Sequence, residues 1–333
     1  MTVAALRGRK ERSEIMTDRR SFLAALGGAA GSAAFSGCSM FTGAASDYDD
    51  NLAVILSDIH VCGDESLGRW LYTRRELRLR IAEILAMKPL PRYVITFGDL
   101  AFKSGDPADY AIAAAEFKAL TGAGVKVVHG TGNHDRRKAM SDYFPEASVS
   151  PVKGRRISEV HFPSCDLILL DTLIEGEVDG EIGAEQFEWL NATLAGRTRP
   201  VFVGAHHSPF TLKEGTTKLV RALKNSPTCA GWINGHGHTW EKRPMVSWGR
   251  DEDVIRSLQL PSAGFWGDIG YVEFRAGADC AEASLIEKGF WFNDEPHPGE
   301  AIPETWWAIV AENRGQRCRF PYSRAHRTYR AAN

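Results

Sequence analysis

Five short polar motifs follow one another along the 333-residue chain. They are Asp58-Ile59-His60, Gly98-Asp99, Gly132-Asn133-His134-Asp135, His206-His207-Ser208-Pro209 and Gly235-His236-Gly237-His238. Together they supply carboxylate, amide and imidazole groups in the numbers that two adjacent metal ions need. The set contains no cysteine, so it fits Mn, Fe, Zn or Co better than a metal that prefers thiolate. The motifs therefore predict a hydrolytic enzyme with two metal ions.

The chemistry of phosphate esters explains why such a pair of cations is needed. Two cations about 3.5–4 Å apart can hold the oxygens of an anionic ester and lower the pKa of a water molecule between them. A carboxylate that both cations share would keep them at that separation. We therefore expect the chain to hydrolyse phosphate esters with a water molecule that two metal ions activate.

Each motif follows a short apolar run, which is typical of a buried strand. The runs are residues 52–57, 93–97, 125–128, 201–205 and 231–234. Open α/β sheets bind their ligands at the carboxyl ends of the strands. We therefore expect the five motifs to meet at that edge of the fold.

The motifs and their order resemble those of the calcineurin-like metallophosphoesterases, over roughly residues 50–290. The resemblance implies two groups of metal ligands that share one aspartate. The first group would be Asp58, His60, Asp99 and His238. The second group would be Asp99, Asn133, His206 and His236. Asp99 would then bridge the two metal ions.

The resemblance also implies catalytic roles beside the metal ions. His134 would contact the phosphoryl oxygen or the leaving group, where a protonated imidazole can stabilise charge or act as a general acid. Asp135, the next residue, would orient that ring. The fourth motif leaves one ligand open, because counting from the start of the strand selects His206, whereas counting back from Pro209 selects His207. We expect His206 to be the ligand and His207 to be its neighbour, with His207 as the alternative.

The contacts of the substrate are less well defined by the sequence. Arg136 and Arg137 directly follow the third motif, so they could bind a phosphate or a second anionic group. A solvated basic turn is the alternative for both. Trp240 and Trp266 could stack on a nucleobase or could pack within the fold.

The paired histidines and the Asn-His-Asp sequence favour phosphodiesters, such as cyclic nucleotides or glycerophosphodiesters, as substrates. A phosphomonoesterase or a nucleotide pyrophosphatase is the alternative among enzymes. A non-catalytic binding lipoprotein with the same fold is the alternative from another class. The formal net charge of −2 gives no reason to expect a nucleic-acid polymer as a partner.

The N-terminal residues predict export from a bacterial cytoplasm. Residues 17–23 read TDRRSFL, a twin-arginine signature, and a weakly apolar run follows to residue 35. Phe35-Ser36-Gly37-Cys38 then resembles a lipoprotein cleavage site, which predicts a lipid anchor at Cys38 and a periplasmic or membrane-anchored protein. The alternative is that Cys38 is incidental and the protein is released in soluble form.

The remaining pattern alternates between helices and strands. Helices are expected at residues 67–87 and 107–120 and from residue 183, and strands at 166–171, 254–260, 271–274 and 281–286. This predicts an α/β fold, a four-layer αββα sandwich of two mixed β-sheets flanked by helices. The expected organisation is an export signal at 1–38, a short linker at 39–50, a metallophosphoesterase domain at 51–298 and a basic C-terminal extension at 299–333.

Overall fold

The computed structural model of the chain describes residues 46–63, 71–145, 150–245, 255–291 and 316–322. These residues belong to one unit that begins at Ser46. The predicted export signal and Cys38 lie outside the described residues, as does most of the predicted C-terminal extension.

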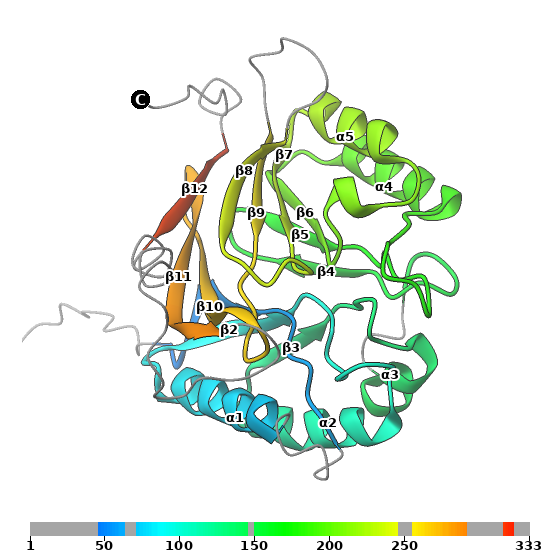
Figure 1. Cartoon of the computed structure of the whole chain (residues 1–333). Helices are drawn as coiled ribbons and strands as arrows, with labels where there is room; N and C mark the ends of the chain where they lie inside the picture. Colours follow the sequence, from blue (N-terminus) through cyan, green and yellow to red (C-terminus); the bar gives the residue numbers. More distant parts are fainter. Residues whose placement is uncertain (1–45, 64–70, 146–149, 246–254, 292–315, 323–333) are drawn as a thin grey trace, which may run out of the picture. The chain divides into compact units, whose positions relative to one another are not determined.

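The first sheet is mixed and contains six strands (Figure 1). They are, in spatial order, β12 (Arg317–Pro321), β11 (Cys280–Trp291), β10 (Gly267–Ala276), β1 (Tyr48–Leu56), β2 (Leu90–Thr96) and β3 (Lys126–His129). β1, β2 and β3 are parallel, whereas β10, β11 and β12 are joined to β1 by antiparallel pairing. Three parallel strands therefore end at the same edge of this sheet.

The second sheet has the same number of strands and is also mixed. Its spatial order is β4 (Ser158–His161), β5 (Asp166–Leu169), β6 (Val201–Ala205), β7 (Cys229–Asn234), β9 (Ile255–Gln259) and β8 (Glu241–Met245). β5, β6, β7 and β9 run parallel, and an antiparallel strand flanks them on each side.

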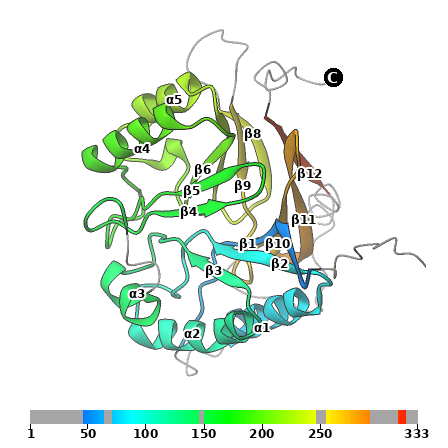
Figure 2. The same ribbon diagram turned by 180° about the vertical axis from the view of Figure 1, so that it is seen from behind.

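Helices cover the outer face of each sheet (Figures 1 and 2). The α-helices are α1 (Leu71–Ala86), α2 (Pro107–Gly122), α3 (Arg137–Tyr143), α4 (Ala184–Gly196) and α5 (Thr216–Asn225), and a short 3₁₀ helix, η3, spans Pro209–Thr211. α1 and α2 pack on the first sheet, and α4 and α5 pack on the second. α2 begins as the sequence predicts, because Asp106 accepts a hydrogen bond from Ala108 N and Pro107 occupies the first helical position.

The alternation of side chains along the strands explains the four layers. In β1, Ala53 and Ile55 face the core between the two sheets, whereas Val54 and Leu56 pack toward α1 and α2. In β6, Phe202 enters the core between the sheets, and the residues on either side of it face α4 and α5. Every central strand is thus buried on both faces, which is why its sequence is a continuous apolar run. The predicted αββα sandwich of two mixed sheets is confirmed.

The domain extends beyond its predicted bounds at both ends. β1 begins at Tyr48, inside the predicted linker, and β12 lies inside the predicted basic extension. β12 has alternating burial, with Cys318 and Phe320 buried and Arg317 and Arg319 exposed. The exposed arginines are the reason why the sequence predicts a basic extension here. The apolar face of the segment nevertheless belongs to the core between the sheets.

Other observed elements were not predicted from the sequence, namely β4, β8, α3 and α5. β4 and β8 are short edge strands of the second sheet, so they lack the long apolar runs that mark the central strands. Among the described residues, no helix combines the length and the apolar character needed to cross a membrane.

Candidate metal centre

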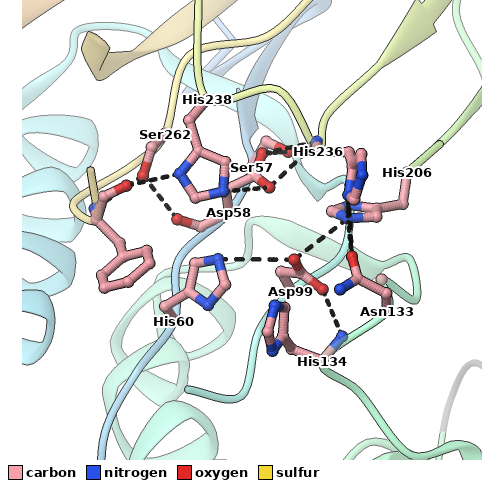
Figure 3. A network of polar contacts seen from close by, with 12 residues as sticks. Ser57, Asp58, His60, Asp99, Asn133, His134, His206, His236, His238 and Ser262 are labelled. Carbon is pink, nitrogen blue, oxygen red and sulfur yellow. Dashed lines mark hydrogen bonds and ion pairs between the residues drawn. The ribbon is translucent and has the colours of Figure 1, made fainter. Parts of the chain in front are cut away.

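The predicted ligands lie directly beyond parallel strands of both sheets. In the first sheet, Asp58 and His60 follow β1, Asp99 follows β2, and Asn133 follows β3. In the second sheet, His206 follows β6, and His236 and His238 follow β7. The seven side chains point toward one another in the space between the strand ends (Figure 3). The sequence-based expectation that the motifs meet at one edge is confirmed for these residues.

Backbone conformation helps to turn the side chains into this space. Within the described ranges, six non-glycine residues have a positive φ, between 48° and 69°. They are Asp58, His60, Asp99, His236, His238 and Trp266. This conformation costs a non-glycine residue about 1–2 kcal/mol, and it persists where the surrounding structure enforces it, often at functional sites. Five of the six residues are predicted ligands, so the strain is concentrated at this site.

Hydrogen bonds between the first two loops enforce part of this geometry. The carbonyl of Asp99 accepts from the backbone N–H groups of Ile59 and His60, at 2.9 Å each. Gly132 allows the third loop to approach equally closely, since a Cβ there would overlap the side chain and the backbone nitrogen of Asp99. The close packing of these three loops brings their side chains within reach of common ions.

The first ligand group contains Asp58, His60, Asp99 and His238, whose donor atoms all lie within 4.8 Å of one another. His238 Nε2 lies 3.2 Å from Asp58 Oδ1, and its Nδ1 donates to the carbonyl of Phe265. His60 Nδ1 contacts the carbonyl of Phe102, while its buried Nε2 lies 3.6 Å from Asp99 Oδ2 and makes no hydrogen bond. A buried imidazole nitrogen without a hydrogen-bond partner, beside carboxylates, fits the role of a ligand to a cation.

The second ligand group surrounds His206 Nε2. This atom lies 3.0 Å from Asn133 Oδ1, 3.2 Å from Asp99 Oδ2 and 3.2 Å from His236 Nδ1. His206 Nδ1 contacts the carbonyl of Phe97 at 2.9 Å, which fixes the orientation of the ring. The Oδ2 atom of Asp99 thus faces His60 in one group and His206 in the other. Its position between the groups suits a carboxylate that two cations share.

The carboxyl groups are ionised in this environment. Burial opposes the ionisation of Asp58, but the proximity of His238 and His206 lowers its pKa to about 2. Burial also opposes the ionisation of Asp99, and His206 nevertheless holds its pKa well below the usual range. Carboxylates are the form that binds metal ions, so both groups are ready to act as ligands.

The imidazoles of the centre fall into two pairs. Burial lowers the pKa of His60 to about 3 and that of His236 to about 4, so both rings are neutral. Burial acts in the same direction at His206 and His238, but the neighbouring carboxylates raise the pKa of His206 to about 9 and also raise that of His238. At both rings the neighbouring carboxylates therefore favour positive charge. The donor set fits cations, which would supply that charge between imidazole and carboxylate.

The structure distinguishes His206 from its neighbour. The donor atoms of His206, His207 and His236 also lie within 4.8 Å of one another. Both nitrogens of His207 are, however, engaged elsewhere, Nδ1 with Thr172 Oγ1 at 2.9 Å and Nε2 with the carbonyl of Val178 at 3.0 Å. His206 keeps its Nε2 directed at Asn133 and Asp99, so its geometry suits a ligand better than that of His207.

His134 lies beside the first ligand group. Its backbone N–H donates to Asp99 Oδ1 at 2.8 Å, and its ring Nδ1 contacts the carbonyl of Lys103 at 2.7 Å. The ring is 4.9 Å from the ring of His60, measured between centroids. Nε2 of His134 has no hydrogen-bond partner among the described residues, and the side chain is partly exposed. This nitrogen is therefore free to contact a substrate.

The predicted contact between Asp135 and the ring of His134 is wrong. The buried carboxylate of Asp135 instead accepts from the backbone N–H groups of Gly132, Leu100 and Ala101 and from the Tyr110 hydroxyl. These donors lie on the loops after β2 and β3 and on α2. Burial and the nearby charge of Asp99 raise the pKa of Asp135 to about 6, against the effect of the backbone donors. Asp135 thus joins two ligand-bearing loops. The ring of His134, which Asp135 was predicted to orient, is instead oriented by the carbonyl of Lys103.

Arg137 makes structural contacts in place of the predicted substrate contact. Its Nε and Nη2 donate to the two carboxylate oxygens of Asp171, at 2.7 and 2.9 Å, and Asp171 is fully buried. Asp171 also accepts from the hydroxyl of Thr131, in the loop that carries Asn133. Arg136 is partly exposed, donates to the carbonyl of Asp135 and lies 3.9 Å from Glu175. Of these two arginines, Arg136 is the one that remains a candidate for contact with the substrate.

We expect Asp171→Ala to lower the free energy of unfolding by about 3–5 kcal/mol, because it leaves the guanidinium of Arg137 without its buried partner. Urea denaturation of the variant and the native protein measures this difference. Glu175→Gln is the matched control. Glu175 accepts a hydrogen bond from the backbone N–H of Arg137, but its side chain is exposed. The control should change stability by about 0.5 kcal/mol or less. Equal denaturation midpoints for Asp171→Ala and Glu175→Gln would contradict the structural role of Asp171.

Two serines that position Asp58 were missed in the sequence. Ser57 Oγ donates to Asp58 Oδ2 at 2.6 Å, and Ser262 Oγ donates to the carbonyl of Asp58 at 2.8 Å. Ser262 also accepts from the backbone N–H of Phe265, so it links the loop before β10 to the first motif. Ser57 could have been noticed because it directly precedes Asp58. Ser262 lies more than 200 residues away, so no local pattern identifies it.

Comparison with known proteins identifies the family. The family description "Calcineurin-like phosphoesterase" matches residues 53–240. A Rhodopseudomonas palustris protein named probable cyclic nucleotide phosphodiesterase is 29% identical over 245 residues, which cover 71% of this chain and 81% of that protein. A Mycobacterium tuberculosis protein named cAMP/cGMP dual specificity phosphodiesterase is 30% identical over 168 residues, 48% of this chain and 50% of that protein.

Solved structures show the same fold. A dimetal phosphatase from Danio rerio superposes with a TM-score of 0.59 at 15% identity, over 82% of this chain and 99% of that one. The purple acid phosphatase PPD1 from yellow lupin gives a TM-score of 0.55 at 13% identity, over 82% of this chain and 54% of that one. The family match covers more than half of the chain, including all five motifs. The chain therefore belongs to the calcineurin-like phosphoesterase family and is a hydrolase of phosphoester bonds.

Proposed function

We propose that the chain hydrolyses phosphodiesters at a centre of two metal ions. The observation that carries this proposal is the position of Asp99, whose carboxylate faces both ligand groups. In this proposal Asp58, His60, Asp99 and His238 hold one ion, and Asp99, Asn133, His206 and His236 hold the other. The ligand types suit Mn, Fe, Zn or Co. Bound at this site, two ions would supply Lewis acidity to the phosphoryl group and activate a water molecule.

His134 is the residue proposed to act on the leaving group. The carbonyl of Lys103 takes a hydrogen bond from Nδ1, so this nitrogen carries a proton and the ring is fixed in orientation. When Nε2 is protonated as well, the imidazolium can stabilise negative charge on phosphoryl oxygen or donate its proton to the departing alkoxide. Asp135 supports this step indirectly, because it joins the loops that carry Asp99 and His134.

The names of the relatives support cyclic nucleotides as the substrate class. A glycerophosphodiester is the second phosphodiester that the site could accept. Phosphomonoesters and nucleotide pyrophosphates are the alternative substrates for the same chemistry. A binding scaffold without catalysis is disfavoured, since all seven proposed ligands are present and directed at common points.

Hydrolysis of two chromogenic esters by the purified protein tests the proposal. The protein is stripped of metal and refilled in parallel with Mn, Fe, Zn or Co, and bis(4-nitrophenyl) phosphate is compared with 4-nitrophenyl phosphate. We expect metal-dependent turnover that favours the diester, together with about two bound ions per chain by elemental analysis. Faster hydrolysis of the monoester would instead identify the protein as a phosphomonoesterase. A folded protein that binds no metal and turns over neither ester would support the scaffold.

We also propose that residues 1–38 direct export by the twin-arginine route and that Cys38 becomes lipidated. The twin arginines at 19 and 20, the apolar run after them and the Phe-Ser-Gly-Cys sequence support this proposal. The native protein, expressed in a bacterium with this export route, should then fractionate with membranes, whereas Cys38→Ser should not. Membrane association that Cys38→Ser leaves unchanged would exclude the anchor. Retention of an Arg19→Lys, Arg20→Lys variant in the cytoplasm would separately test the export route.

A further inference from the structure

Three aromatic side chains lie on one side of the candidate metal centre, beside the first ligand group. The Phe265 ring is 4.3 Å from the ring of His60, and the Phe102 ring is 6.0 Å from Phe265, measured between centroids. The Trp266 ring lies 5.5 Å from the ring of His238 at an angle of 70°. Phe102 comes from the loop after β2, and the other two come from the loop before β10. This aromatic wall is therefore built by two separate loops that meet at the ligands.

Trp266 is the exposed member of the wall. It has 37% of its surface accessible, whereas Phe102 and Phe265 are only partly exposed. Burial of a large apolar side chain lowers the free energy, so an exposed indole next to a reaction centre calls for an explanation.

The backbone of Trp266 makes this choice of residue more unusual. Its φ is 48°, a conformation that is rare for a bulky residue and favours glycine. This backbone conformation helps to position His238, because the carbonyls of Trp266 and Phe265 both face its Nδ1, at 3.1 and 2.9 Å. Those carbonyl contacts do not need an indole, and glycine would make them with less strain. The side chain of Trp266 is therefore not explained by the positioning of His238.

We propose that the indole of Trp266 is the surface on which the nucleobase of a nucleotide substrate stacks. The inference rests on the proposed function, since the phosphate must bind at the metal centre for the base to reach Trp266. Stacking of a base on an aromatic side chain suits every base, and it strengthens binding by about tenfold or more. A glycerophosphodiester has no ring to place there. The wall thus favours nucleotides over glycerol esters.

The contacts of Arg137 are consistent with this substrate class. The guanidinium of Arg137 is held by Asp171 and does not reach out to a second phosphate. Of Arg136 and Arg137, Arg136 is the one that could still meet a second anionic group. With Arg137 engaged, these residues match a substrate with one phosphate and one aromatic base better than a pyrophosphate. A cyclic nucleotide and its nucleoside monophosphate product both meet this description.

Calorimetric titration of the Mn-loaded full-length protein tests the inference without relying on turnover. Adenosine 5′-monophosphate and ribose 5-phosphate carry the same phosphate and sugar, so the ratio of their dissociation constants isolates the base. We expect the native protein to bind the nucleotide at least about tenfold more tightly. Trp266→Gly, which removes the indole and relieves the strained backbone, should bring the ratio close to one, while Trp266→Phe should preserve most of it.

Leu79→Ala is the matched control, because Leu79 is an exposed apolar residue of α1, with 40% of its surface accessible. It should leave the ratio unchanged. A ratio near one in the native protein, or one that Trp266→Gly does not alter, would overturn the inference. Hydrolysis of bis(4-nitrophenyl) phosphate by the same preparations tests the proposed function separately. If the protein hydrolyses that ester but binds the nucleotide no more tightly than the sugar phosphate, the stacking inference alone is wrong. If it prefers the nucleotide but hydrolyses no ester, the proposed catalytic function alone is wrong.

Discussion

Replacing Asp99 with asparagine is expected to lower phosphodiester hydrolysis by about 10³-fold or more and to reduce the bound metal to one ion per chain or fewer. Asparagine has nearly the same shape as aspartate, but it lacks the charge that would hold two cations together. The carboxylate of Asp99 faces His60 at 3.6 Å and His206 at 3.2 Å, so its charge acts on both ligand groups. Elemental analysis and initial rates on the same preparations measure the two effects.

The control for this prediction is Asp142→Asn. Asp142 is an exposed carboxylate of α3 that pairs with Lys138 on the surface, and its loss should leave rate and metal content within about twofold of native. Circular dichroism confirms that both variants fold. An Asp99→Asn protein that retains two ions and more than about a tenth of the native rate would exclude a bridging role.

Replacing His134 with alanine is expected to lower the rate by about 10²- to 10⁴-fold while two metal ions remain bound. The ring of His134 forms its hydrogen bond with the carbonyl of Lys103, and the hydrogen bond from His134 to a ligand, Asp99, comes from its backbone N–H. Alanine keeps that N–H, so the metal centre should stay intact. If the ring protonates the leaving group, the loss should be larger for a diester with an alkyl alcohol than for one with nitrophenolate, which leaves without a proton.

Rates for the two types of leaving group therefore separate the possible roles of His134. Equal losses would indicate that the ring stabilises phosphoryl oxygen rather than donating a proton. A rate within about threefold of native for both esters would contradict any catalytic role. His161→Ala serves as the control, because His161 is an exposed imidazole on the edge strand β4.

The arrangement of the ligands was predictable because each follows a continuous apolar run. Such runs arise only where a strand is covered on both faces, and β1, β2, β6 and β7 are covered by the other sheet on one side and by helices on the other. The polar residues at the ends of these strands could then be placed together without knowledge of any loop. The same reasoning failed for β12, where exposed arginines alternate with Cys318 and Phe320.

The contacts that hold the ligands were not predictable, because they join distant parts of the chain. Ser262 reaches the carbonyl of Asp58 across 204 positions, and Thr131 meets Asp171 across 40. Adjacency in sequence was also misleading, since Asp135 was expected to orient the ring beside it. Side chains of consecutive loop residues often point in different directions, and the buried carboxylate of Asp135 accepts hydrogen bonds from backbone N–H groups of the ligand-bearing loops.

The distribution of the ligands over two sheets links metal binding to the folding of the whole domain. Asp58, His60, Asp99 and Asn133 extend from the first sheet, whereas the three other histidines extend from the second. The core between the two sheets is made of apolar side chains, which resist sliding weakly because their contacts have no preferred direction. Hydrogen bonds also cross between the sheets, from Tyr93 of β2 to the carbonyl of His161 in β4 and from Arg256 of β9 to the carbonyl of Arg319 in β12. Ions bound by ligands from both sheets would fix the position of one sheet relative to the other. Because the unfolded chain cannot form this binding site, the stability of the domain, as well as its activity, would depend on the concentration of free metal.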